Sequence, residues 1–255
     1  MADIQLILRA DGIGYSEAVN YGIEKSVKEG LIRSAGLMPN MPAAAHGLKL
    51  LAGTGICLGQ HTNLCLGRPC ADPARVPSLL DAAGNLKSSR AYREAWARGE
   101  EFTVLEEMVL EVEAQYFRFR ELTGQDPEYF EAHAVISDNL NKALTIVAER
   151  YHLPYFSTTP RTRTGSFKGK PIAVCPMDSM HADYDPWQSL KNAVNHAVPG
   201  IPNVFICHPG YLDDYILHHS SLTINRTKEV AMLCDPDVRQ WLEAQQVELI
   251  SYRDI

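Results

Sequence analysis

Apolar and polar residues follow one another along the chain in blocks that predict alternating strands and helices. Residues 4–10 form an apolar run that ends abruptly at Asp11, as a buried strand would at its exit. Ser16 suits the N-cap of a helix, and apolar side chains then recur at four-residue spacing over residues 19–27. A strand followed by an amphipathic helix is the first half of a β–α–β unit.

The same alternation continues to the far end of the chain. Further strands are predicted over residues 31–38, 55–64, 129–133, 154–158, 172–176, 202–210 and 247–254. Further helices are predicted over residues 43–51, 102–123, 139–151, 187–196, 227–233 and 236–246. Seven or eight strands alternating with helices favour a (β/α) barrel, distorted or incomplete, over an open sheet, because no glycine-rich nucleotide motif follows a strand. Residues 1–255 are expected to form a single domain.

Two stretches depart from this alternation. Residues 67–101 contain several prolines and glycines, which predicts a long insertion over the strand ends of the kind that often forms a lid or a binding loop. Residues 160–170 are basic in an otherwise acidic chain, and Arg161 and Arg163 could bind a phosphate or carboxylate of a substrate. A solvated charged loop is the simpler explanation of this segment, and hydrolysis of a phosphorylated sugar is a further alternative.

Composition and charge narrow the class of protein. A net charge of −7 and a pI near 5.7 argue against a nucleic-acid partner, which needs a basic face. No apolar run approaches the roughly 18 residues that span a bilayer, and the N-terminus lacks a signal-peptide pattern, so we expect no membrane partner and a cytoplasmic location. The six cysteines are widely spaced and are expected to be reduced. A homodimer is compatible with exposed barrel helices.

Four polar side chains end or follow predicted strands, and parallel strands would bring them to one rim: Asp11, His61, His133 and His208. Two imidazoles and a carboxylate could hold Zn²⁺ or a similar divalent ion with a position open for water. His61 and His133 are then the candidate metal ligands. Asp11 would be a ligand or the general base, and His208 could protonate a leaving group. Each residue alone also has a structural explanation, but the set predicts hydrolysis of an amide or ester.

These residues stand in longer motifs whose order and spacing suit one family. The motifs are Ala10-Asp11-Gly12-Ile13-Gly14-Tyr15-Ser16 with Asn20-Tyr21-Gly22-Ile23, Gly59-Gln60-His61, His133 after a short strand, Cys207-His208-Pro209, and Ser251-Tyr252-Arg253-Asp254. Together they resemble the YdjC-like (ChbG-type) carbohydrate deacetylases, over residues 4–254. The resemblance implies a (β/α) barrel related to polysaccharide deacetylases and removal of acetyl groups from N-acetylated sugars such as chitooligosaccharides.

The resemblance also implies roles for individual residues and a small carbohydrate as the substrate. It makes His61 and His133 ligands of one divalent ion, Mg²⁺ or Zn²⁺, with Asp11 as the general base and His208 as the candidate acid. Gly12 departs from the family pattern, because the family usually has a second, metal-binding Asp there. A catalytically weakened sugar-binding or regulatory protein is therefore the alternative to an active deacetylase.

Overall fold

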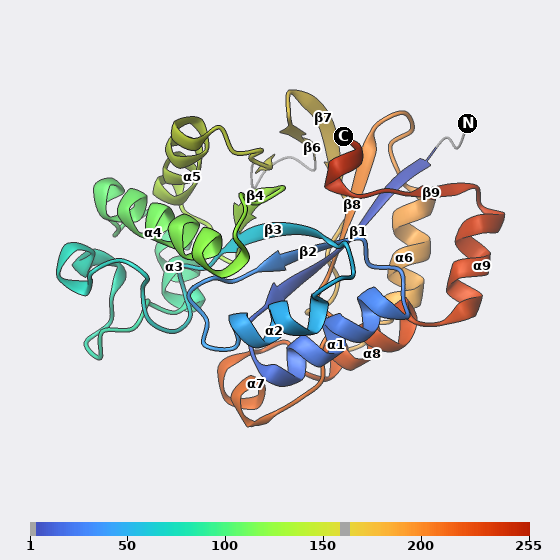
Figure 1. Ribbon diagram of the computed structural model, residues 1–255, viewed down its shortest axis with the longest axis horizontal. Coiled ribbons are helices and arrows are strands. Elements are labelled where there is room, and N and C mark those ends of the chain that lie inside the picture. The colour runs from blue at the N-terminus through green and yellow to red at the C-terminus, as the bar shows by residue number, and fades with distance from the viewer. Residues whose placement is uncertain (1–3, 159–163) are drawn as a thin grey trace.

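One curled sheet runs through residues 4–158 and 164–255, which the computed structural model describes (Figure 1). Its strands are β1 (Ile4–Ile13), β2 (Ser34–Leu37), β3 (Cys57–Thr62), β4 (Phe130–Ala132), β5 (Ser157–Thr158), β6 (Thr164–Phe167), β7 (Lys170–Val174), β8 (Pro202–Cys207) and β9 (Val247–Leu249). They lie in the order β4-β3-β2-β1-β8-β7-β6-β5, and β9 pairs with β1.

The strand directions create a single rim of carboxyl ends. β1 to β4 and β7 to β9 all run parallel, whereas β6 pairs antiparallel with both β5 and β7. The two ends of the sheet meet through one isolated bridge, between Phe130 and Tyr155. This incomplete barrel confirms the predicted fold class. The β6–β7 hairpin is one strand more than predicted and replaces part of the loop expected over residues 160–170.

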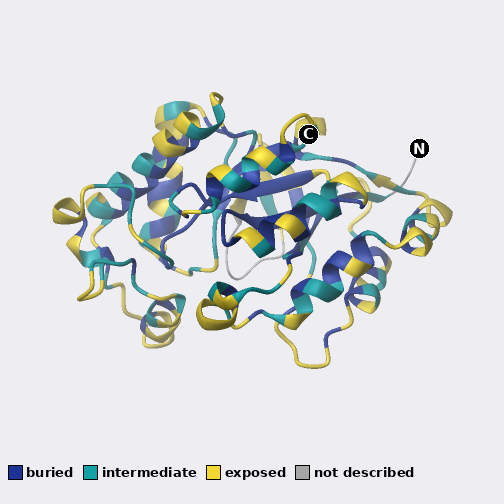
Figure 2. Cartoon of the chain, turned by 60° about the horizontal axis from the view of Figure 1, so that its bottom comes forward, coloured by how far each residue is buried: buried dark blue, intermediate teal, exposed yellow. Residues whose placement is uncertain are grey.

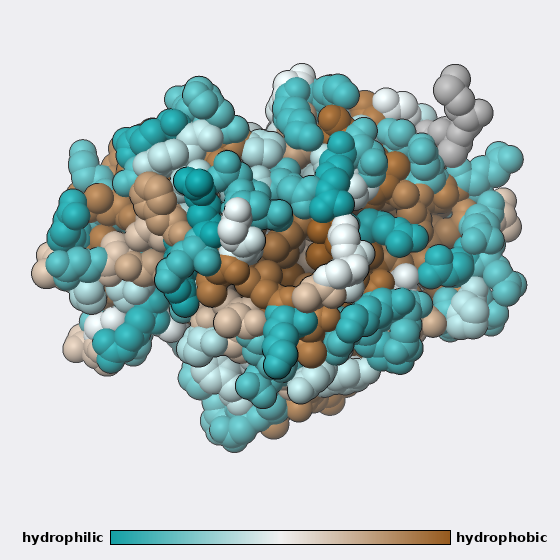
Figure 3. Space-filling view, viewed as in Figure 1, coloured by the Kyte–Doolittle hydropathy of each residue, from teal (hydrophilic) through white to brown (hydrophobic). Residues whose placement is uncertain are grey.

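Most of the helices have one buried side and one exposed side (Figure 2). They are α1 (Glu17–Lys28), α2 (Ala44–Leu51), α3 (Ser89–Ala97), α4 (Leu105–Thr123), α5 (Asp138–Tyr151), α6 (Pro186–Asn195), α7 (Asp214–His219), α8 (Ile224–Leu233) and α9 (Pro236–Ala244). The predicted helices are all present, and α3 and α7 are additional. Hydrophilic residues cover most of the face seen in Figure 3, and apolar ones are visible in a central hollow. No helix among the described residues has the length and apolarity needed to cross a membrane.

The insertion over residues 67–101 is ordered by its contacts with α4. Glu111, buried on α4, accepts hydrogen bonds from the backbone N–H groups of Cys70 and Ala71 at 3.0 and 2.8 Å. The insertion also contributes Leu79 and Tyr92 to a buried apolar cluster shared with α4 and α5. This segment is therefore folded against α4, with α3 near its end.

The C-terminal segment turns back into the barrel after a short strand. A strand was predicted over residues 247–254, but β9 ends at Leu249 and a 3₁₀ helix follows at Tyr252–Asp254. Ser251 and Asp254 form a capping box that favours this turn over an extended strand. Tyr252 is fully buried and stacks on Tyr129 with 4.2 Å between ring centroids. Its hydroxyl thereby reaches the polar side chains described below.

Candidate functional site

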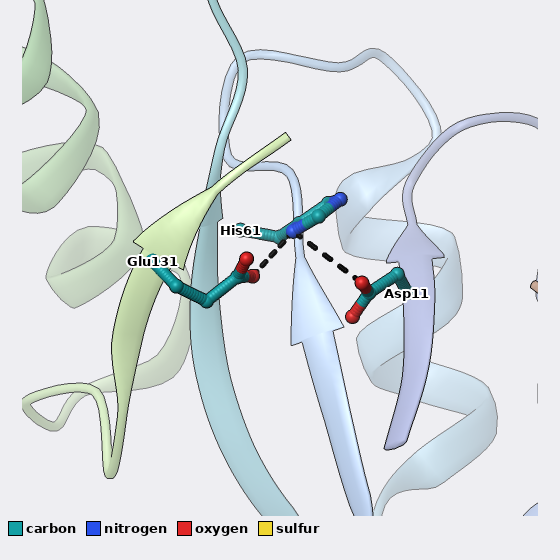
Figure 4. A group of neighbouring side chains, drawn as sticks. All are labelled: Asp11, His61 and Glu131. Carbon is teal, nitrogen blue, oxygen red and sulfur yellow. Dashed lines mark hydrogen bonds and ion pairs between the residues drawn. The ribbon is translucent and has the colours of Figure 1, made fainter. Parts of the chain in front are cut away.

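Three side chains from neighbouring strands point toward one another near the carboxyl ends of the strands: Asp11 of β1, His61 of β3 and Glu131 of β4 (Figure 4). All three are buried, and each offers one ligand atom within 4.8 Å of the others. Gly36 of β2 lies between them. A Cβ there would lie 2.9 Å from the His61 Cβ and 3.3 Å from the Asp11 Oδ1. A glycine at this position therefore makes the close approach of the two side chains possible.

The two ring nitrogens of His61 contact different groups. Nδ1 forms a hydrogen bond with a carboxylate oxygen of Glu131 and lies 4.0 Å from Asp11 Oδ2. Nε2 lies 2.8 Å from Nδ1 of His133, which directly follows β4. A carboxylate that accepts the Nδ1 proton orients the ring and leaves the Nε2 lone pair available to bind a metal. His61 Nε2 and His133 Nδ1 are therefore a candidate pair of nitrogen donors.

Arg9 supplies the positive charge of this cluster. Its Nη2 donates to Asp11 Oδ2 at 2.6 Å and lies 3.4 Å from an oxygen of Glu131. Its Nη1 donates to the Tyr252 hydroxyl at 3.2 Å. Arg9 is only 2% exposed, so these contacts compensate a charge that would be costly to bury alone.

Burial and neighbouring charges set the protonation states. Burial disfavours the ionised form of Asp11, but the positive charges around it, led by Arg9, outweigh this and lower its pKa. For His61, burial lowers the pKa, whereas Glu131 and Asp11 outweigh it and raise it. Burial, with like-charge repulsion from His61, holds the pKa of His133 well below its usual range. Asp11 is therefore ionised and His133 neutral at pH 7.

His208 follows β8, and its peptide group is held by helix α8. Glu229 accepts the His208 backbone N–H, and Arg226 donates to the His208 carbonyl oxygen at 3.3 Å. Glu229 also accepts a hydrogen bond from the Tyr184 hydroxyl at 2.8 Å. Burial lowers the pKa of the His208 ring to about 3. Its Nδ1 is buried and has no hydrogen-bond partner among the residues the structure describes.

A cavity of about 620 Å³ adjoins these groups. Asp11, His61, His133 and His208 all line it, so the structure brings the four predicted residues together. The insertion contributes Ser89 and Arg93, as expected for a segment over the strand ends; the wall also includes Tyr15, Met177, Met180, Leu222 and Arg226. The volume is within the range of small-molecule binding sites.

Several site details differ from the sequence expectation. Asp11 lies within β1, which continues to Ile13, and not at the strand exit. Arg161 and Arg163, the predicted substrate-binding residues, lie outside the described residues. Sequence reasoning missed Glu131 and Arg9. A signal was present, because each stands two residues before a recognised site residue and therefore on the same face of its strand.

The backbone at Gly12 is in a conformation that suits glycine. Its φ is +107°, and a Cβ there would lie 3.9 Å from the Tyr15 side chain and 4.0 Å from Val19. Space is therefore available, but an L-residue would be strained. With no acidic side chain at this position, the carboxylates within reach of His61 are those of Asp11 and Glu131.

Comparison with solved structures shows which fold this is. The chain is similar to a protein from Enterococcus faecalis V583, provisionally assigned to cellobiose-phosphate cleavage, with a TM-score of 0.80, 23% identity and coverage of 99% of this chain and 98% of the other. It is also similar to the Xyl-CE4 domain of a multidomain xylanase from the hindgut metagenome of Trinervitermes trinervoides, with a TM-score of 0.54, 9% identity and coverage of 99% and 89%. The fold is thus the predicted polysaccharide-deacetylase-like one.

Sequence comparison identifies the family. The chain is 31% identical to carbohydrate deacetylase 2 of Listeria innocua, over 99% of both chains. It is 30% identical to a carbohydrate deacetylase of Geobacillus stearothermophilus, over 97% of this chain and 96% of the relative. The profile of the family described as YdjC-like protein matches residues 5–244. This match covers nearly the whole chain and includes the motifs around Asp11, His61, His133 and His208. The chain therefore belongs to the YdjC-like protein family.

Proposed function

We propose that this enzyme is a metal-dependent carbohydrate deacetylase that removes acetyl groups from N-acetylated sugars or oligosaccharides of the chitooligosaccharide type. The observation that carries the proposal is the convergence of Asp11, the His61–His133 pair and His208 on one cavity. The carbohydrate deacetylase names of full-length relatives support the reaction class.

The donor set fits one divalent ion. His61 Nε2 and His133 Nδ1 lie 2.8 Å apart, and the Asp11 Oδ1 is buried without a hydrogen-bond partner among the described residues. His61 and His133 would hold the ion, and the carboxylates of Asp11 and Glu131 lie near the other ring nitrogen of His61, Nδ1. Imidazole donors suit Zn²⁺ better than Mg²⁺, which prefers oxygen ligands. When bound, the ion would polarise the acetamide carbonyl and make water more acidic.

Asp11 and His208 would handle the protons of the reaction. Asp11 is ionised and held by Arg9 through Oδ2, so Oδ1 remains to accept a proton from the attacking water. The departing amine needs one proton, which is the one that Asp11 has taken. His208 lines the same cavity and would deliver it. Because burial lowers the pKa of His208 to about 3, its ring is neutral at pH 7; it would first take this proton from Asp11 and then pass it to the amine.

The test is acetate release from N-acetylated di- and trisaccharides, with and without added Zn²⁺ or Mg²⁺. The wild type should release acetate and lose activity with a chelator. His61→Ala should abolish both metal binding and turnover. His196→Ala, an exposed histidine at the end of α6, is the matched control and should behave as the wild type. Turnover by folded His61→Ala would show that the metal assignment is wrong.

A catalytically weakened sugar-binding protein is the second candidate, favoured by Gly12 and by the Arg9 contacts of Asp11 and Glu131. In that case sugar binding would be measurable by calorimetry while no acetate appears under any metal condition. Release of phosphate from a phosphorylated disaccharide, measured in the same samples, would instead indicate a phosphosugar hydrolase.

A further inference from the structure

Arg9, a charged residue in a mostly apolar strand, lies beside the two carboxylates of the candidate metal site. Arg9 and Asp11 are two residues apart on β1 and therefore face the same side of the sheet. The same guanidinium nitrogen, Nη2, lies 2.6 Å from Asp11 and 3.4 Å from Glu131. Two of the three members of the group that could hold a metal ion are thus ion-paired within the chain.

Further contacts hold the guanidinium in this position. Nη1 donates to the Tyr252 hydroxyl at 3.2 Å, and the guanidinium carbon lies 5.9 Å from the ring centroids of both Tyr129 and Phe156. The side chain is almost fully buried. Arg9 therefore cannot swing into solvent without leaving several partners, and its positive charge is a permanent feature of the cluster.

A divalent ion bound beside Asp11 and Glu131 would lie close to the positive charge of Arg9, in a buried environment that water screens poorly. Like charges a few ångströms apart repel strongly where water is excluded. Gly12 offers no further carboxylate to offset the repulsion. The nitrogen pair of His61 and His133 differs in this respect, because no ion pair links either ring to Arg9 among the described residues.

We propose that Arg9 is an internal counter-cation that withholds Asp11 and Glu131 from the metal ion and so keeps the metal affinity of the site low. The inference rests on the metal site of the proposed function but not on the deacetylation reaction. It predicts a site in which the ion is exchangeable and depends mainly on His61 and His133.

The experiment measures Zn²⁺ affinity in competition with a chromophoric chelator, on metal-free full-length protein without substrate. Arg9→Gln removes the charge and should bind Zn²⁺ at least tenfold more tightly than the wild type. Arg9→Lys is the matched control, because it keeps the charge, and should stay within about threefold of the wild type, a difference below 1 kcal/mol. Equal or weaker binding by Arg9→Gln would overturn the proposal.

A second comparison keeps the test valid if Arg9→Gln fails to fold with two unpaired carboxylates. Glu131→Gln and the double variant Arg9→Gln/Glu131→Gln differ only in the charge at residue 9. The double variant has the same net charge in the cluster as the wild type, and it should bind Zn²⁺ at least tenfold more tightly than Glu131→Gln. Equal affinities, or no Zn²⁺ binding by any of the proteins, would overturn the inference. If the affinities follow the prediction but no acetate is released, the inference stands and the proposed function fails.

Discussion

The buried carboxyl group of Glu229 should make the stability of the protein fall as the pH rises. Glu229 is fully buried on α8, where it accepts the His208 N–H and the Tyr184 hydroxyl. Burial raises its pKa from the ordinary 4.5 to about 7, against the opposing effects of these hydrogen bonds and of Arg226. We predict that Glu229→Gln removes this pH dependence.

The magnitude follows from the difference between the two pKa values. Because the folded protein binds the proton more tightly than the unfolded chain, the stabilisation is fully present below pH 4.5 and is lost as the pH rises through about 7. That difference corresponds to roughly 3 kcal/mol of unfolding free energy. Glutamine cannot ionise, and its side-chain oxygen can still accept the His208 N–H. Between about pH 4.5 and pH 8, the unfolding free energy of Glu229→Gln should therefore rise by about 3 kcal/mol relative to that of the wild type.

Urea unfolding at a series of pH values measures this difference. Glu243→Gln, at an exposed position on α9, is the control and should follow the wild type at every pH. If Glu229→Gln and the wild type lose or gain stability in parallel across the range, Glu229 does not titrate as argued.

Two glycine substitutions test the backbone of the site. Gly12→Asp should lower the unfolding free energy by about 1–3 kcal/mol, because the φ of +107° at residue 12 strains any L-residue. Urea unfolding measures this loss. A variant as stable as the wild type would contradict the strain argument. Gly59→Ala should also lower the unfolding free energy by about 1–3 kcal/mol, because the new Cβ would lie 2.3 Å from the Tyr129 ring and would force its neighbours to shift. The same measurement applies, and an unchanged stability would show that the buried ring moves aside.

Local rules were sufficient where a structure depends on nearby residues. Ser16 accepts the Val19 N–H as the predicted N-cap, and Gly124 ends α4 in a left-handed conformation with φ of 73°. The β6 strand was missed because its largely exposed residues carry no clear apolar alternation. Its strand conformation depends on pairing with β7, which sequence periodicity does not report.

The same distinction between local pattern and tertiary contact applies to the site. The sequence by itself determined that Asp11, His61, His133 and His208 would gather at one rim, because each lies near the end of a strand and parallel strands share a direction. Only the tertiary structure decided that Arg9 of β1 meets Glu131 of β4. A charge inside an apolar strand is tolerated only if an opposite charge lies within reach. Here the partners of Arg9 are Asp11 on the same strand and Glu131 on β4, a strand distant in the sequence. Periodicity shows which way a side chain faces, whereas the curvature of the sheet determines what it meets.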